Sequence, residues 1–131
     1  MKKYIFLFFF FIPCLGFSSP YDYLTTINEN NGDVFIDFSS LQKRKNLVKV
    51  WIYVDNKVIQ SFQKETYLSV RHFVEIHCDD RTYRMLETTY FEKNHLQGKI
   101  VYSTVSPTEL MNIPPNSFGS LLRSSTCFLK K

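Results

Sequence analysis

Alternating hydrophobic and polar residues predict β-strands along most of this chain. In the clearest run, residues 47–54, three valines and an isoleucine fall on one face, whereas Lys49, Trp51 and Tyr53 fall on the other. Such a period of two is that of a strand, whose successive side chains point to opposite faces. Similar runs predict four further strands, at residues 34–38, 69–78, 82–91 and 99–105.

Polar segments between these runs predict the connections. Asn31-Gly32 is a turn signal, and residues 42–46 and 79–81 are expected to be hairpin turns. Residues 55–57 are expected to end the strand at 47–54, and residues 58–68 have no clear period and are expected to be mostly loop.

The last part of the chain predicts a short helix. The sequence Ile-Pro-Pro-Asn-Ser at 113–117 ends extended structure and supplies a cap, so the helix should begin near Ser117. Its apolar stripe is expected to be Phe118, Leu121, Leu122 and Ser125. Consecutive strands followed by one helix predict an α+β fold: an antiparallel sheet of about five or six strands with the C-terminal helix packed on one face.

The N-terminus has the pattern of a secretory signal peptide over residues 1–19. Lysines at positions 2 and 3 precede a 14-residue apolar core, and small residues follow for cleavage near Ser18 or Ser19. The core is shorter than the ~20 residues of a membrane-spanning helix, so an uncleaved anchor is the weaker alternative. Cys14 follows Phe-Ile-Pro, which fits a lipidation site poorly, and it is expected to leave with the signal. Residues 20–131 then form one domain.

Charge excludes some classes of partner. The chain carries a formal net charge of +4, which falls to +2 without Lys2 and Lys3. That is too mild to indicate binding to nucleic acid or to an anionic membrane. Because the sequence has no Asn-x-Ser/Thr glycosylation site, it is more typical of a bacterial exported protein than of a eukaryotic secreted one.

Two cysteines remain after cleavage, Cys78 and Cys127. In an oxidising compartment their number favours one disulfide, with a metal site or a reactive thiol as the alternatives. Strand alternation turns His77 to the face opposite Cys78. His72 shares the face of Cys78 but lies about 20 Å away along the strand. Neither histidine is therefore expected to be a close metal ligand or base partner of Cys78. Cys127 lies off the predicted helix stripe and is therefore expected just after the last turn.

No stretch of the sequence indicates catalysis or a cofactor. Asp79-Asp80 could be a pair of catalytic carboxylates, but Asp is also the residue that a turn prefers. Nucleophile-elbow, phosphate-loop and zinc-protease motifs are all missing from the sequence. We therefore expect a protein that is not an enzyme and has no cofactor.

The order of several motifs resembles the surface-adhesin protein E-like family of small exported bacterial proteins. It runs over about 95 residues, from Asp33 to Cys127, through "FIDFSSL", "VKVWIYVD", "CDDR" and "IPPNS". The resemblance implies an antiparallel sheet whose concave face holds a C-terminal helix through a Cys78–Cys127 disulfide. It also implies an adhesin, since the family takes its name from a protein that binds host vitronectin and laminin.

Three classes of function are left open. The first is a binding module for a protein partner, with a candidate surface of Lys49, Trp51, Tyr53, Arg71 and Phe73. That surface could instead be covered by residues 21–32 or by a second copy in a homodimer. The second class is a periplasmic structural or accessory protein without host contact. The third is a small enzyme or haem binder that uses His72, His77 or His95.

Overall fold

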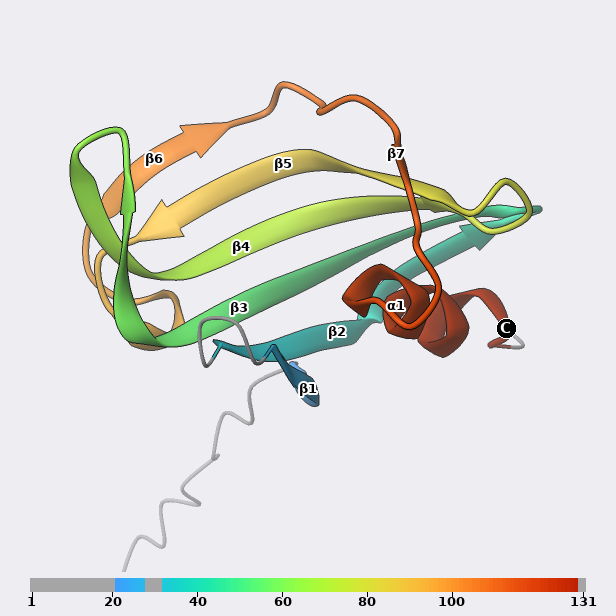
Figure 1. Ribbon diagram of the computed structural model, residues 1–131, viewed down its shortest axis with the longest axis horizontal. Coiled ribbons are helices and arrows are strands. Elements are labelled where there is room, and N and C mark those ends of the chain that lie inside the picture. Colours follow the sequence, from blue (N-terminus) through green and yellow to red (C-terminus); the bar gives the residue numbers. More distant parts are fainter. Residues whose placement is uncertain (1–20, 28–31, 130–131) are drawn as a thin grey trace, which may run out of the picture.

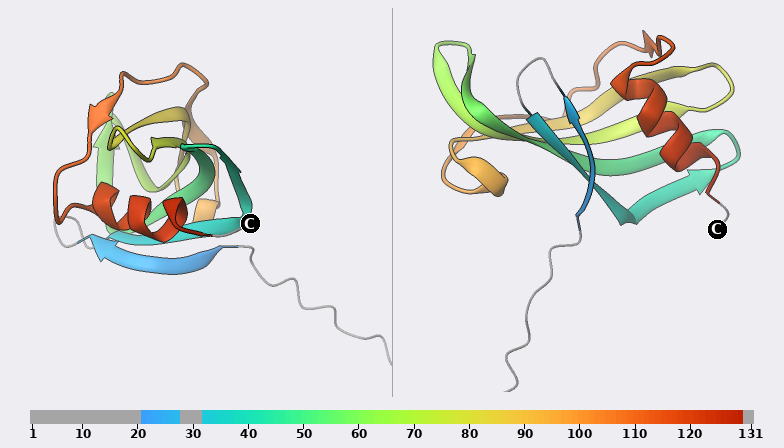
Figure 2. Two further views of the ribbon diagram at one scale, coloured as in Figure 1. Left: turned by 90° about the vertical axis from the view of Figure 1, so that its right-hand side faces the viewer. Right: turned by 60° about the horizontal axis from the view of Figure 1, so that its bottom comes forward.

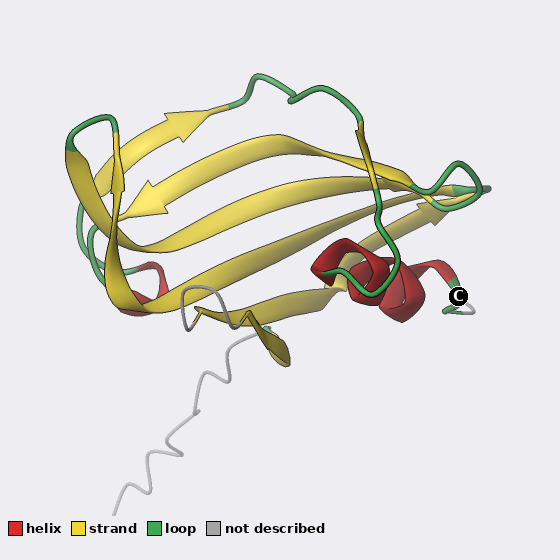
Figure 3. Ribbon diagram, viewed as in Figure 1, coloured by secondary structure: helices red, strands yellow, loops and turns green. Residues whose placement is uncertain are grey.

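A computed structural model describes residues 21–27 and 32–129. Figure 1 and Figure 3 show one antiparallel sheet in the order β1-β2-β3-β4-β5-β6, with the short β7 paired to β5 and one helix, α1. The α+β prediction is confirmed. The elements are β1 Asp22–Ile27, β2 Gly32–Arg44, β3 Leu47–Phe62, β4 Glu65–His77, β5 Thr82–Phe91, η1 Asn94–Leu96, β6 Ile100–Thr104, β7 Met111–Asn112 and α1 Phe118–Cys127.

The core lies between the sheet and α1. Val50 pairs with Val74, and Ile52 with Ile36, so the apolar sets of three central strands share one face. That face also packs against Leu122 of α1, and all five side chains are at most 1% exposed. The predicted alternation of residues 47–54 therefore sets which side of the sheet is buried.

β3 and β4 extend further than the sequence pattern predicted. Residues 55–57 do not end β3: a register shift between Asp55 and Gln60 lets the strand continue, and residues 58–68 form a hairpin rather than a loop. The hairpin turns at Gln63-Lys64, both with positive φ. Two-residue hairpin turns of this kind usually contain Gly or Asn, so this turn lacked its sequence signal.

α1 begins where the sequence predicted but buries a different face. Ser117 caps it, its Oγ accepting a hydrogen bond of 3.2 Å from the backbone N–H of Ser120. The buried residues of the helix are Gly119, Leu122, Thr126 and Cys127, whereas Leu121 is 38% exposed. The prediction that Leu121 belongs to the apolar, buried face of the helix was wrong. The helix docks on the sheet through the side that carries Gly119 and the disulfide cysteine Cys127, and this orientation leaves Leu121 towards solvent.

The predicted disulfide between Cys78 and Cys127 is confirmed, with 5.9 Å between the two Cα atoms. Cys127 is the last residue of α1 rather than a residue beyond it. Two further bonds hold α1: Arg123 Nε donates to the Cys78 carbonyl, beside the disulfide, at 2.8 Å, and Lys43 Nζ of β2 donates to the Cys127 carbonyl. Figure 2 shows α1 against one face at one end of the sheet.

Candidate functional site

The face of the sheet opposite α1, called the far face below, carries an aromatic pair at its centre. Trp51 of β3 and Phe73 of β4 are register partners, and their rings stack with centroids 4.8 Å apart and planes 20° apart. Both side chains are half-buried. The predicted orientation of Trp51, away from the disulfide and the helix, follows from the register that places Val50 and Ile52 in the core.

A guanidinium lies beside this aromatic pair. The Arg71 Cζ atom is 4.9 Å from the Trp51 ring centroid and 5.8 Å from that of Phe91. Phe91 pairs with Ser69, two residues before Arg71, and so reaches the same face. Such contacts combine a cation–π attraction with packing of the arginine stem. Arg71 is thus held between aromatic side chains of β3 and β5.

Tyr53 is the one candidate surface residue that the structure buries. It is 6% exposed, because Phe35 stacks on its ring at 4.7 Å and Tyr21 meets it edge-on at 4.7 Å. The expected cover by residues 21–32 is therefore present at Tyr53, while Trp51 and Phe73 have no ring contact with β1 among the contacts described. Burial raises the pKa of Tyr21, and the nearby Arg71 charge acts in the opposite direction.

At the disulfide end of the far face, Lys49 pairs in register with Glu75. The Glu75 carboxylate is almost buried, at 5% exposed, and its Oε1 receives His77 Nε2 at 2.7 Å and Arg84 Nη2 at 3.0 Å. A buried carboxylate needs such partners to offset its desolvation. This cluster is therefore satisfied within the sheet and has a structural explanation.

The three histidines lie in different surroundings. His72 is on the helix side of β4, where its Nδ1 lies 2.9 Å from Thr88 Oγ1 and burial lowers its pKa to about 4. His77 is bound to Glu75, as described above, and His95 is on the exposed connection after β5. Across residues 21–27 and 32–129, no three His, Cys, Asp or Glu side chains form a group that could hold a metal ion.

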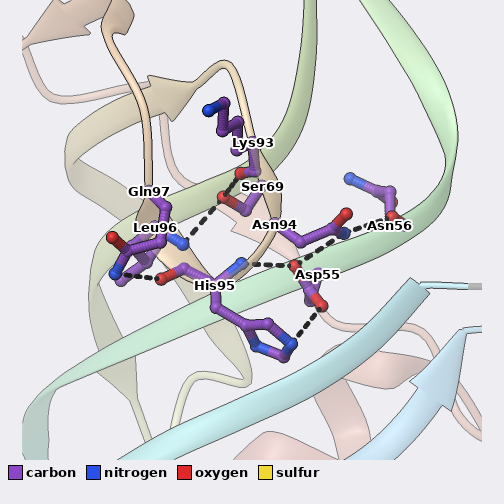
Figure 4. Close-up of polar contacts among 8 residues, drawn as sticks. All are labelled: Asp55, Asn56, Ser69, Lys93, Asn94, His95, Leu96 and Gln97. Carbon is purple, nitrogen blue, oxygen red and sulfur yellow. Dashed lines mark hydrogen bonds and ion pairs between the residues drawn. The ribbon is translucent and has the colours of Figure 1, made fainter.

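An Asp, a His and a Ser do approach one another at η1 (Figure 4). Asp55 Oδ1 accepts the His95 backbone N–H at 2.8 Å, and Asp55 Oδ2 lies 3.5 Å from His95 Nε2. Ser69 Oγ, however, donates to the Lys93 carbonyl at 2.6 Å and accepts from the Leu96 N–H at 3.0 Å. A nucleophilic serine must instead bond to its histidine base. The cluster fixes the β5–β6 connection to the sheet.

An open depression of about 430 Å³ lies at the disulfide end, where the two predicted turns meet. Residues of the β2–β3 turn and of the β4–β5 turn line it, including Lys45, His77 and the pair Asp79-Asp80. The sequence located both turns but gave no sign that they adjoin. Cys78 N–H donates to the Asn46 carbonyl at 2.8 Å, which joins them.

No helix in the described part of the chain is long and apolar enough to cross a membrane. The predicted signal peptide, residues 1–19, lies outside the described residues.

Comparison with known proteins identifies the family. The sequence model of surface-adhesin protein E matches residues 21–128, which is nearly all of the described chain. The chain belongs to this family. The surface-adhesin protein E resemblance predicted from the motif order is thereby confirmed. Among curated proteins, none matches this chain.

Solved structures of the Haemophilus influenzae protein E share the fold. Its crystal form II superposes with a TM-score of 0.63 at 15% identity, covering 84% of this chain and 88% of the other. A second structure of that protein gives 0.60 at 15% identity, with 84% and 85% covered. Protein E from non-typeable Haemophilus influenzae gives 0.54 at 15% identity, with 80% and 74% covered.

Within this surface-adhesin fold, one far-face residue had not been predicted from the sequence. Phe91 ends the predicted run 82–91, but its face depends on the register of β5 against β4. That register shifts between Phe73 and Val74. Counting alternate residues along β5 therefore does not show which face of the sheet each side chain lies on. Only the pairing of Phe91 with Ser69 places its ring beside Arg71.

Proposed function

We propose that this surface-adhesin protein E family member is an exported envelope or surface protein that binds a protein partner through its far face. The binding surface consists of Trp51, Phe73, Arg71 and Lys49. The observation that carries this proposal is the Trp51–Phe73 stack with Arg71 against it, half-buried on the face that α1 leaves open.

The composition of this surface suits protein recognition. Aromatic rings and arginine are enriched at protein interfaces. The aromatic rings supply large contact areas at small conformational-entropy cost. The rings are also held in place before binding, because Trp51 and Phe73 brace each other across two central strands. A surface that is ordered in advance loses less entropy when a partner binds.

The family suggests the class of partner. We propose a host extracellular-matrix protein, such as vitronectin or laminin, as the target, and no enzymatic activity. Residues 1–19 would act as the signal peptide and residues 20–131 as the adhesin domain. The alternative is a periplasmic structural or accessory protein with the same fold and no host contact, and self-association through the far face is a further outcome to be measured.

Substitution of Trp51 by alanine tests the surface. Binding to immobilised vitronectin and laminin should weaken by at least about tenfold, as for a central aromatic of an interface. The free energy of unfolding should fall by less than the ~3–5 kcal/mol of a fully buried aromatic. Binding, urea unfolding and sedimentation would be measured on the same protein.

Tyr102→Ala is the matched control, because Tyr102 is a 37% exposed aromatic on β6, outside the far-face cluster. It should leave binding unchanged. A large loss of stability in Trp51→Ala, with unchanged binding and self-association, would remove the support for this surface.

A further inference from the structure

Arg71 differs from the other half-buried arginines of the described chain in having no hydrogen-bond acceptor among the described contacts. Arg44 and Arg81 are exposed. Arg84 and Arg123 are half-buried, and each has an acceptor: the Glu75 carboxylate at 3.0 Å and the Cys78 carbonyl at 2.8 Å. Arg71 is equally half-buried, yet within residues 21–27 and 32–129 no carboxylate lies within 4.0 Å of it.

One nitrogen of the guanidinium shows the same lack. Arg71 Nε is buried and makes no hydrogen bond, and it is the one such side-chain nitrogen or oxygen among the described residues. Buried donors in folded proteins nearly always have an acceptor, and those without one call for an explanation. Because Nε is enclosed, an incoming carboxylate would meet the two terminal nitrogens of the guanidinium, which are not among the buried unbonded atoms. A guanidinium is well suited to hold a carboxylate by two parallel bonds.

The acidic side chains Asp37, Glu75 and Glu87 of the far face do not serve as hydrogen-bond acceptors for Arg71. Asp37, which pairs with Trp51 in the sheet, accepts hydrogen bonds from the backbone and hydroxyl of Ser39. Glu75 is bound by His77 and Arg84. Glu87 lies in register with Phe73 and forms no ion pair with Arg71 among the described contacts.

The surroundings of Arg71 would strengthen a bond to an incoming anion. Trp51 and Phe91 contact the guanidinium, and the Tyr21 ring stands over the neighbouring Tyr53. Aromatic walls exclude water, and a charge-assisted hydrogen bond is stronger where the local dielectric constant is low. The same walls favour apolar groups on either side of the anion.

We propose that Arg71 receives a carboxylate of the protein partner: an Asp or Glu side chain flanked by apolar residues that contact Trp51 and Phe73. This inference rests on the proposed function of the far face and adds the chemistry of recognition. It assigns the aromatic pair the role of contact area and Arg71 the role of selecting an acidic segment.

The test uses Trp51, the only tryptophan of the chain, as a reporter of its own site. Two blocked peptides, Ala-Leu-Glu-Leu-Ala and Ala-Leu-Gln-Leu-Ala, would be titrated at equal ionic strength while Trp51 fluorescence and its indole N–H resonance are followed. The glutamate peptide should bind at least about tenfold more tightly than the glutamine peptide, the difference expected for a charge-assisted bond.

Arg71→Gln should abolish this preference, and Arg71→Lys, which keeps the charge without the planar fork, should retain only part of it. Arg44→Gln removes the same charge from the exposed end of β2 and should leave the preference intact. Thermal unfolding of each variant would confirm that it is folded, and the peptide comparison in the unsubstituted protein does not depend on any variant.

Equal binding of the two peptides, no binding of either, or a preference that survives Arg71→Gln would overturn the proposal. Equal binding that Trp51→Ala abolishes, measured by calorimetry because this variant lacks the tryptophan reporter, would leave the far face as a binding surface and refute only the carboxylate. Vesicles of phosphatidylglycerol and of phosphatidylcholine form a separate arm. Arg71-dependent binding to the anionic vesicles without peptide preference would assign Arg71 to a membrane surface and also overturn the proposal.

Discussion

At the scale of the residue, Arg71 and His72 show how strand alternation separates two adjacent basic side chains. Arg71 lies on the far face against Trp51, whereas His72 lies on the helix side beside Thr88. Burial lowers the pKa of His72 to about 4 from 6.5. The imidazole is consequently neutral in the folded protein at pH 7, and its positive form is disfavoured by desolvation.

This lowered pKa predicts loss of stability in mild acid. Between about pH 6.5 and 4 the unfolded chain binds a proton at residue 72 and the folded protein does not, so the free energy of unfolding falls as the pH falls. The loss is complete below the folded pKa and amounts to at most about 3 kcal/mol. Urea unfolding from pH 7 to pH 4 measures it.

His72→Gln is the control for this prediction. Glutamine cannot gain the proton, so the variant should lose less stability than the parent protein over the same pH range, and the difference between the two isolates residue 72 from other titrating groups. Identical pH dependence of the two proteins would show that His72 is not held neutral by burial.

At the scale of the element, the two adjacent leucines of α1 test which face of the helix docks. Leu122 is 1% exposed and packs in the core, whereas Leu121 is 38% exposed. Leu122→Ala should lower the free energy of unfolding by about 2–5 kcal/mol. Leu121→Ala should change it by less than about 0.5 kcal/mol. Denaturant unfolding of both variants compares them directly, and a greater loss at Leu121 would favour the stripe predicted from the sequence.

The Cys78–Cys127 disulfide is expected to contribute strongly to the stability of the domain and to the attachment of α1 to the sheet. The cysteines are 49 residues apart, and closing a loop of that size stabilises a domain by about 4 kcal/mol in the chain-entropy model. Cys78→Ser with Cys127→Ser should therefore lower the melting temperature clearly. Arg123 and Lys43 would still bond the helix end to the sheet, so helical content should persist at low temperature. An unchanged melting temperature would show that packing alone holds α1.

The β3–β4 hairpin shows why element boundaries were harder to predict than elements. Residues 55–57 are polar and resemble a strand end, but Asp55 is buried as the acceptor for Asn94 and His95. That function depends on η1, 39 and 40 residues away in the sequence. A pattern read within one segment cannot include a partner so distant.

At the scale of the whole molecule, the side of the outer membrane on which this exported protein lies separates the two proposed functions. The family is one of surface adhesins, and the matched region covers residues 21–128. Protease treatment of intact cells should degrade this protein if it acts as an adhesin on the outer surface. A periplasmic marker should remain intact in the same sample. Full protection of the protein, with degradation after the outer membrane is opened, would favour the periplasmic alternative.

The sequence by itself determined the faces of the strand at residues 47–54, the helix start and the family, and it favoured the disulfide. The strand faces and the helix start depend on information local to one segment, namely the alternation at residues 47–54 and the Pro-Pro-Asn-Ser cap. The disulfide follows from the number of cysteines, and the family from the order of motifs along the chain. Trp51 was correctly placed opposite the helix by the same alternation.

Only the tertiary structure decided which of the candidate surface residues are accessible and which contact one another. Tyr53 has the same parity as Trp51, but β1 brings Tyr21 over it and the hydrogen-bonded register brings Phe35 beside it. Phe91 reaches Arg71 through a register shift that no local pattern records. Burial and pairing depend on segments that are distant in the chain, and for that reason the unpaired guanidinium of Arg71 became visible only in the folded molecule.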